Sequence, residues 1–381
     1  MTIEIKNLRK AAERILEAVE KKEKVIVFGD SDPDGVGSVI ILKETLEDLG
    51  LKPVEIYFPN REIEGYGMNE SALRYLKKHA PGLLITIDCG IGNVKEAEIA
   101  KKMGFEVVII DHHKVLSEVP NVEIIVDPKQ EDDEFPFKEF AAAGLAYKLS
   151  QMLFSIAGQE MNVNKFLELA SLSTIADMML MEDENEVIIR EGMLALNFTK
   201  RLGLLALIDL TDFKNWDIQE VKEKIVSVLN AGETKNHLNE AYLLLIEKDE
   251  KKALLRAKKL IEKQEEKREE IDRIVREVEE RTDEFSEVIF EGDPSWPLVL
   301  LGPSASRLCN FYGKPVFLHK RLDKESPGSV RVPLGLDAVK AMTSCNELLE
   351  TYGGHPSAAG FRLKNENLEE FKNCLITYFK K

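Results

Sequence analysis

The sequence predicts an α/β protein of two domains, a first domain built on a mostly parallel sheet and a smaller α/β domain, joined by a long helix. Five short apolar runs alternate with helical stretches between residues 24 and 127. Continuous apolar runs are typical of strands that are buried on both faces of a parallel sheet. The length of 381 residues fits two or three domains at roughly 150 residues each.

The five expected strands share an apolar, β-branched composition, and four of them end in aspartate. In chain order they are VIVFGD (25–30), VEIYF (54–58), LLITID (83–88), EVVIID (106–111) and VEIIVD (122–127). Ligands of open α/β sheets bind outside the carboxyl ends of the strands. We therefore expect Asp30, Asp88, Asp111 and Asp127 to face one crevice.

The rest of the chain predicts helices, a bridge and a second domain. Residues 137–210 form helical runs, and the segment from Asp249 to Glu284 is apolar at both ends but has no apolar residue over 262–270. That pattern indicates a helix between two domains, and a solvated surface helix is the alternative. We expect a first α/β domain over 1–210, a helical connector over 211–284 and a second α/β domain over 285–381.

Within the second domain, strand-like and helical runs alternate. The strand-like runs are VIFEG (288–292), PLVLLG (297–302) and KPVFLHK (314–320), and GLDAVKAMTSCNELLETY (335–352) indicates a helix.

Composition excludes several classes of protein. The 52 Lys and Arg against 68 Asp and Glu give a net charge of −16, which argues against a generally basic protein that coats nucleic acid but allows metal ions held among carboxylates. The N-terminal segment is a charged amphipathic helix, and no apolar stretch of about 18 residues occurs. We expect a cytoplasmic protein with no membrane contact.

The four cysteines, Cys89, Cys309, Cys345 and Cys374, are far apart and form no CxxC pair. They indicate neither a zinc knuckle nor a disulfide framework, so we expect reduced thiols.

The first chemical motif is GDSDPDGVGS over 29–38, which places Asp30, Asp32 and Asp34 within five residues. Carboxylates packed so closely repel one another unless cations neutralise them, which predicts a divalent metal site. A calcium loop of the EF-hand type starts similarly, but here a buried strand precedes the motif and the closing Glu is missing.

The second motif is IIDHHK, in which Asp111, His112 and His113 follow a strand directly. Imidazole with carboxylate suits manganese, iron or zinc. Together with the first motif and with Asp88 in TIDCG, it predicts two cations a few ångströms apart, an arrangement used in phosphoester hydrolysis.

These motifs resemble those of the DHH phosphoesterase superfamily, and within it the RecJ type of single-strand-specific exonuclease. The motifs DSDPDG, TIDCG and DHH are similar to the family's first three, and STIADMMLMEDENEVIIREG (173–192) is similar to the fourth. The resemblance continues, in the family's order, through the segments AAAGLAYKL (141–149), LNAGE (229–233), SASRL (304–308), GSVR (328–331) and GGHPSAAGF (353–361).

The resemblance implies roles for individual residues. The metal ligands it implies are Asp30, Asp32, Asp34, Asp88, His112 and Asp177. Asp88 would bridge the two cations, Asp111 would orient a histidine, and His113 would bind a cation or a phosphate. The substrate residues it implies are Arg307, Ser329, Arg331, Gly353, Gly354 and His355, because arginines grip phosphates bidentately and glycines let backbone amides approach them. Surface arginines in ion pairs are the alternative interpretation.

The resemblance implies a divalent-metal-dependent exonuclease that acts on an end of single-stranded DNA or RNA in repair or replication. Mn²⁺ is the expected cation and Mg²⁺ is the alternative. A helicase complex is a candidate partner. The length resembles compact archaeal relatives without an oligonucleotide-binding barrel, and we expect a monomer.

Two alternatives stay open, namely a phosphodiesterase for very short oligonucleotides or dinucleotides and a non-catalytic replication scaffold. Phe28 stands where the smaller hydrolases carry a histidine, which counts against the first. The filled ligand positions count against the second.

Overall fold

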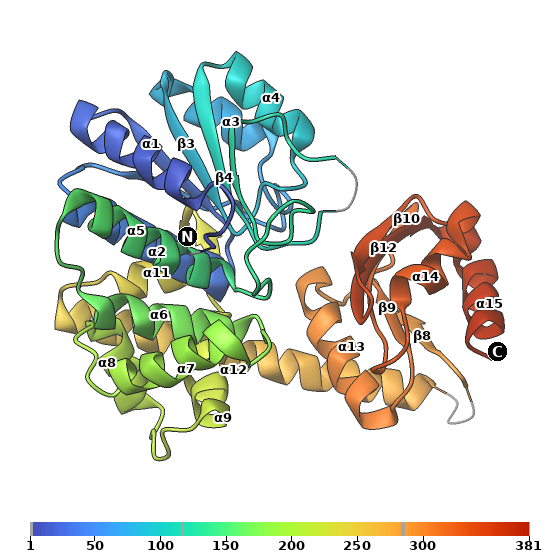
Figure 1. Cartoon of the computed structure of the whole chain (residues 1–381). Coiled ribbons are helices and arrows are strands. Elements are labelled where there is room, and N and C mark those ends of the chain that lie inside the picture. The colour runs from blue at the N-terminus through green and yellow to red at the C-terminus, as the bar shows by residue number, and fades with distance from the viewer. Residues whose placement is uncertain (1–2, 116–117, 283–285, 381) are drawn as a thin grey trace. The chain divides into compact units, whose positions relative to one another are not determined.

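A computed structural model describes residues 3–115, 118–282 and 286–380. The chain divides into two compact units, Met1–Gln264 and Glu265–Lys381 (Figure 1). The division falls inside one long helix, so each unit is described separately.

The first unit is built on a parallel sheet of five strands in the order β2-β1-β3-β4-β5. The strands are β1 (Val25–Gly29), β2 (Glu55–Tyr57), β3 (Gly82–Ile87), β4 (Phe105–Ile110) and β5 (Ile124–Val126). Along β3, Leu83 and Ile85 belong to one hydrophobic cluster and Leu84 to another, so the sheet is buried on both faces. The predicted α/β fold with a parallel first sheet is confirmed.

Helices cover both faces of this sheet. Those before β4 are α1 (Leu8–Lys21), α2 (Pro33–Asp48), α3 (Glu70–Leu76) and α4 (Val94–Lys102), and those after β5 are α5 (Ala142–Ala157), α6 (Val163–Ala176), α7 (Asp183–Leu196), α8 (Leu202–Leu210), α9 (Ile218–Val221), α10 (Ser227–Leu229) and α11 (Glu240–Leu245). A short hairpin, β6 (Thr234–Lys235) and β7 (Leu238–Asn239), precedes α11. Residues of α1, α2 and α5 build one cluster, and residues of α3 and α4 build the other.

The long helix α12 (Glu250–Arg281) is apolar only at its ends. Ala257 and Leu260 are buried in the core of the first unit, whereas Ile274 and Val278 are buried in a core of the second. The predicted bridging helix is therefore present. No helix in the described ranges combines the length and the apolarity that crossing a membrane requires.

The second unit holds a mixed sheet in the order β11-β12-β10-β9-β8. Its strands are β8 (Ile289–Gly292), β9 (Val316–His319), β10 (Glu325–Arg331), β11 (Thr351–His355) and β12 (Ala358–Lys364), and its helices are α13 (Leu298–Tyr312), α14 (Ala338–Thr343) and α15 (Leu368–Phe379). Only the β8–β9 pair is parallel. Helix α13 packs on the face that carries Val316 and Leu318, and α14 and α15 pack on the face that carries Phe317.

Two expectations for this unit are wrong. The run PLVLLG (297–302) begins helix α13 and is not a strand, because the buried Leu301, Ala305 and Leu308 repeat at helical spacing. The run 335–352 is helical only over α14 and a short 3₁₀ turn, and its last two residues already belong to β11.

The expectation of four reduced thiols is also wrong. Cys345 and Cys374 form a disulfide, while Cys89 and Cys309 are buried free thiols. The spacing of 29 residues hides the pairing, because Cys345 follows α14 and Cys374 lies on α15, and both helices pack on the same face of the sheet.

Candidate metal centre

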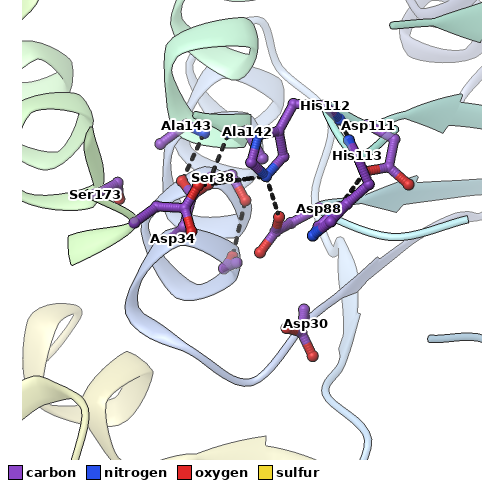
Figure 2. Close-up of polar contacts among 12 residues, drawn as sticks. Asp30, Asp34, Ser38, Asp88, Asp111, His112, His113, Ala142, Ala143 and Ser173 are labelled. Atoms are coloured by element: carbon purple, nitrogen blue, oxygen red, sulfur yellow. Dashed lines mark hydrogen bonds and ion pairs between the residues drawn. The ribbon is translucent and has the colours of Figure 1, made fainter. Parts of the chain in front are cut away.

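Buried acidic residues meet the DHH histidines at the carboxyl ends of the first sheet (Figure 2). Asp30 follows β1, Asp88 follows β3 and Asp111 follows β4, and each of the three is at most 2% exposed. Parallel strands bring their carboxyl ends to one edge, so these side chains converge as the alternation of strands and helices predicts. Asp177, at the end of α6, joins them from a distant part of the chain.

His112 lies at the centre of this cluster. Its Nε2 is 3.2 Å from Asp88 Oδ1 and 3.7 Å from both Asp34 Oδ2 and Asp177 Oδ2. Three groups have ligand atoms within 4.8 Å of one another, namely Asp34, His112 and Asp177, then Asp88, His112 and His113, and then Asp30, Asp32 and Asp88. Asp88 is in two of these groups, so the geometry allows it to serve two adjacent cations.

Burial sets the protonation of these groups. Burial, followed by repulsion from Asp177 and Asp32, raises the pKa of Asp34 well above its ordinary value. Burial and the charges of Asp32 and Asp34 do the same for Asp88, and burial raises the pKa of Asp177 to about 6. Burial also lowers the pKa of His112 to about 3. A neutral imidazole among carboxylates that repel one another is a donor set that fits a divalent cation.

Two helix N-termini fix the first motif. Asp32 caps α2, where its Oδ1 accepts from the N–H groups of Asp34 and Gly35, each at 3.0 Å. The carboxylate of Asp34 accepts from the N–H of Ala142 at 2.7 Å and of Ala143 at 2.9 Å, at the start of α5. Free N–H groups at a helix start bind carboxylates well. Helix α5 therefore holds Asp34 in position.

The contact between α5 and Asp34 gives a first testable prediction, the variant Ala142→Pro. Ala142 is the first residue of α5 and Ala141 is extended, so proline fits the backbone but removes the N–H that donates to Asp34. We expect an intact fold by circular dichroism and Mn²⁺ affinity reduced by about 10–100-fold, measured by calorimetry, since groups that orient ligands have effects of that size.

Leu298→Pro is the control, because it also places proline at the first residue of a helix, α13, where the side chain is exposed. Unchanged Mn²⁺ affinity in Ala142→Pro would contradict the role of α5.

Asp111 acts as an organiser of the DHH motif. Its Oδ1 accepts from the N–H of His112 at 2.8 Å and lies 2.7 Å from His113 Nδ1, and its Oδ2 accepts from the N–H of Ile91 at 2.9 Å. Although burial opposes ionisation, the hydrogen bond to His113 holds the pKa of Asp111 below its ordinary value. Asp111 thus orients His113 and the backbone that carries His112.

Two site residues escaped the sequence analysis, Arg61 and Tyr66. Arg61 donates from Nε to Asp30 Oδ1 at 2.8 Å and lies 3.0 Å from Asp32 Oδ2, so it supplies positive charge to the first motif. Tyr66 donates from its hydroxyl to the carbonyl of Asp88 at 3.0 Å and lies 3.2 Å from His113 Nδ1. Both belong to FPNREIEGYG (58–67), whose only signal is a polar loop directly after a strand.

The β6–β7 hairpin, which follows the LNAGE segment, supports the loop between Asp30 and Asp32. Asn239 is fully buried, and its Nδ2 donates to the carbonyl of Ser31 at 2.8 Å. Thr234 Oγ1 donates to Ser31 Oγ at 3.1 Å. This contact joins segments that lie more than two hundred residues apart in the sequence and explains why the hairpin belongs to the site.

Asp127, the fourth aspartate at a strand end, has a different role. Its Oδ1 accepts from the N–H of Lys129 at 2.8 Å, and it belongs to none of the three groups of ligand atoms. Burial raises the pKa of Asp127 to about 7. It closes the turn after β5.

The implied substrate residues lie in the second unit. Arg331 Nε donates to Ser306 Oγ on α13 at 3.0 Å, and Arg307 on the same helix is paired with Asp272. Across β10, β12 and β11, Ser329 pairs with Gly360, which pairs with Gly353. In the same way Arg331 pairs with Ala358, which pairs with His355. Gly354 lies next to Gly353 on the edge strand β11, and the side chain of His355 lies outside the described part of the structure.

A parallel α/β sheet whose strand ends gather buried carboxylates and imidazoles defines a metal-binding protein of the α/β class. Residues 24–181 match the DHH family, N-terminal domain, and residues 286–381 match the DHHA1 domain. The chain therefore belongs to the DHH superfamily, and its predicted resemblance to the RecJ type is confirmed by the relatives below.

Curated relatives share most of this chain but are longer. The single-stranded-DNA-specific exonuclease RecJ of Bacillus subtilis is 35% identical over 98% of this chain and 48% of its own length. RecJ of Thermus thermophilus is 29% identical over 98% of this chain and 54% of its own length. The chain thus spans about half the length of these relatives.

Solved structures agree with the fold. A crystal structure of exonuclease RecJ bound to manganese matches with a TM-score of 0.84 and 28% identity, over all of this chain and 96% of that one. RecJ of Thermus thermophilus in complex with Mn²⁺ matches with a TM-score of 0.87 and 26% identity, over all of this chain and 55% of that one. The same enzyme has also been crystallised with Mg²⁺.

Proposed function

We propose that the protein is a divalent-metal-dependent exonuclease that hydrolyses phosphodiester bonds at an end of single-stranded nucleic acid. The observation that carries this proposal is the cluster of three overlapping ligand groups around His112 and Asp88. Two cations held side by side suit the transfer of a phosphoryl group to water. The RecJ relatives, which are single-stranded-DNA-specific exonucleases, support DNA as the substrate, and RNA belongs to the proposal as a second substrate.

The proposal assigns ligands by group. Asp34, His112 and Asp177 would hold one cation, and Asp30, Asp32 and Asp88 would hold the other. Mn²⁺ is the expected ion, since the donors are carboxylates with imidazole and the RecJ structures contain manganese. When bound, the cations would lower the pKa of water and stabilise charge on the phosphate.

Residues of the chain would position the groups that take part in the reaction. Helix α5 fixes Asp34 through two N–H groups, and Asp111 fixes His113 through Nδ1. His113 would then use Nε2 to contact a phosphate oxygen. The buried side chains of Asp30, Asp34 and Asp88 are kept from bulk water. In the second unit, Arg331 and Arg307 would bind phosphates, with Ser329, Gly353, Gly354 and His355 beside them.

A time course on single-stranded DNA and RNA, labelled separately at each end, tests the proposal. We expect stepwise shortening from one end with Mn²⁺, slower or equal shortening with Mg²⁺, and none with a chelator. The labelled end that disappears first gives the polarity. Comparison of the rates on DNA and on RNA gives the sugar preference.

Other outcomes would contradict this activity. Activity that vanishes as the strand is lengthened would indicate a phosphodiesterase for very short oligonucleotides. Cation binding without hydrolysis of any strand would indicate a non-catalytic role.

The proposal also includes a cytoplasmic location and a function in DNA repair or replication, with a helicase complex as partner.

A further inference from the structure

The disulfide of the second unit closes a covalent ring around the β11–β12 hairpin. Cys345 follows α14 and Cys374 lies on α15, and the 29-residue separation encloses both strands of the hairpin and the GGHPSAAGF segment. Helices α14 and α15 lie on one side of the second unit (Figure 1). The segment with Gly353 and Gly354 therefore lies inside this ring.

The two strands of the enclosed hairpin are held differently. Strand β12 pairs with β10 along its length and buries Phe361 and Leu363, whereas β11 is the edge of the sheet and, within the described ranges, pairs with β12 alone. The turn between them is held by two backbone bonds, in which Ala338 N–H donates to the carbonyl of Pro356 at 2.7 Å and Val332 N–H donates to that of Ser357 at 3.1 Å. Ala338 begins α14. The disulfide therefore ties the far end of the helix that holds this turn.

The two sulfurs differ in access. Cys345 is only 4% exposed and belongs to the hydrophobic core of the unit, whereas Cys374 is half-buried at the outer side of that core. A thiolate from solution can attack only a sulfur that it can reach. Because Cys374 is the more exposed residue of the pair, we expect attack at its Sγ, and Cys345 would be the leaving group.

We propose that Cys345 and Cys374 form a reversible redox site, at which a cellular dithiol of the thioredoxin type opens the ring and loosens the β11–β12 hairpin. One thiolate of the dithiol attacks Cys374 Sγ, the S–S bond breaks, and Cys345 leaves and takes a proton. The second thiol of the dithiol then displaces Cys374, which also takes a proton. Two electrons pass to the protein, the dithiol becomes a disulfide, and a disulfide oxidant reverses the exchange.

Opening the ring acts on the hairpin through chain entropy. The closed loop reduces the number of conformations that the opened hairpin can adopt, and reduction of the disulfide removes this restriction. An edge strand then opens locally more often. The hairpin carries Gly353 and Gly354, so its loosening weakens the binding of single-stranded nucleic acid. This consequence rests on the proposed exonuclease function.

Hydrogen exchange of the whole protein tests the redox site directly. Reduction with dithiothreitol is expected to accelerate amide exchange over 351–364 by about 10²-fold, with little change in the first unit. Titration of the unfolded protein is expected to give two free thiols before reduction and all four cysteines after it. Glutathione disulfide is expected to restore the slow exchange.

Variants separate the ring from side effects of the reductant. Cys345→Ser with Cys374→Ser is expected to exchange quickly without any reductant, and Cys309→Ala, which changes a buried free thiol, is expected to respond to reduction as the wild type does. Unchanged exchange on reduction, or failure to reform the disulfide, would overturn the proposal.

The affinity for a single-stranded DNA 12-mer, measured in both redox states, is expected to fall several-fold on reduction. Equal affinity in the two states would overturn the effect on strand binding. If exchange responds and no strand is hydrolysed in either state, the redox site stands and the proposed exonuclease function fails.

Discussion

Asp88→Asn is expected to lower kcat/KM on single-stranded DNA by at least about 10³-fold, which corresponds to about 4 kcal/mol of transition-state stabilisation. Asp88 belongs to two of the three ligand groups, and its Oδ1 lies 3.2 Å from His112 Nε2. The backbone at Asp88 has φ of 61°, a left-handed conformation that asparagine tolerates. The substitution therefore removes the negative charge and leaves the backbone in place.

The same variant is expected to bind fewer cations and to be more stable than the wild type when no metal is bound. Burial and the neighbouring carboxylates raise the pKa of Asp88, which means that its charge is unfavourable in the folded protein at neutral pH. Asparagine removes that cost. Calorimetry with Mn²⁺ and thermal unfolding in chelator measure the two effects.

Asp127→Asn is the matched control, because Asp127 is also a buried aspartate that directly follows a strand of the same sheet. It belongs to none of the ligand groups, so we expect activity within about twofold of the wild type. Retention of activity within tenfold by Asp88→Asn would show that the centre lies elsewhere.

The parts of the fold that the sequence predicted are those with a strong local pattern. The five buried strands of the first sheet and the bridging helix stand out because apolar residues continue without interruption or cluster at the two ends of a polar helix. Strands β10, β11 and β12 gave no such signal, because Gly, Pro and Ser interrupt them. Their pairing is decided by contacts between distant segments.

The candidate site shows the same division. Asp30, Asp88 and Asp111 were predicted because each directly follows an apolar strand. The groups that orient them were not, since backbone N–H groups such as that of Ala142 leave no mark in a sequence. Asn239, likewise, meets Ser31 only after more than two hundred intervening residues have folded. Residue types therefore indicate candidate ligands, whereas the groups that position them appear only in three dimensions.

Gly35→Ala is expected to lower activity by about 10²-fold or more, although Gly35 is not itself in a ligand group. An added Cβ would lie 2.3 Å from the carbonyl oxygen of Asp30 and 2.9 Å from its Cα. Both contacts are to backbone, which has no flexible end that can move aside. The start of α2 must therefore shift away from the end of β1, and this shift separates Asp30 from Asp32 and Asp34. A displacement of about 1 Å can cost 10²-fold in rate.

Gly92→Ala provides the comparison, because an added Cβ there meets no atom within 4 Å. We expect this control to keep its activity, its Mn²⁺ stoichiometry and its melting temperature, whereas Gly35→Ala loses activity and binds Mn²⁺ more weakly. If Gly35→Ala kept its activity and its Mn²⁺ affinity, the spacing of Asp30, Asp32 and Asp34 would not depend on the close approach of α2 to β1. Loss of activity with unchanged Mn²⁺ affinity would instead show that the glycine serves the position of the substrate phosphate, because the ligands would then remain in place.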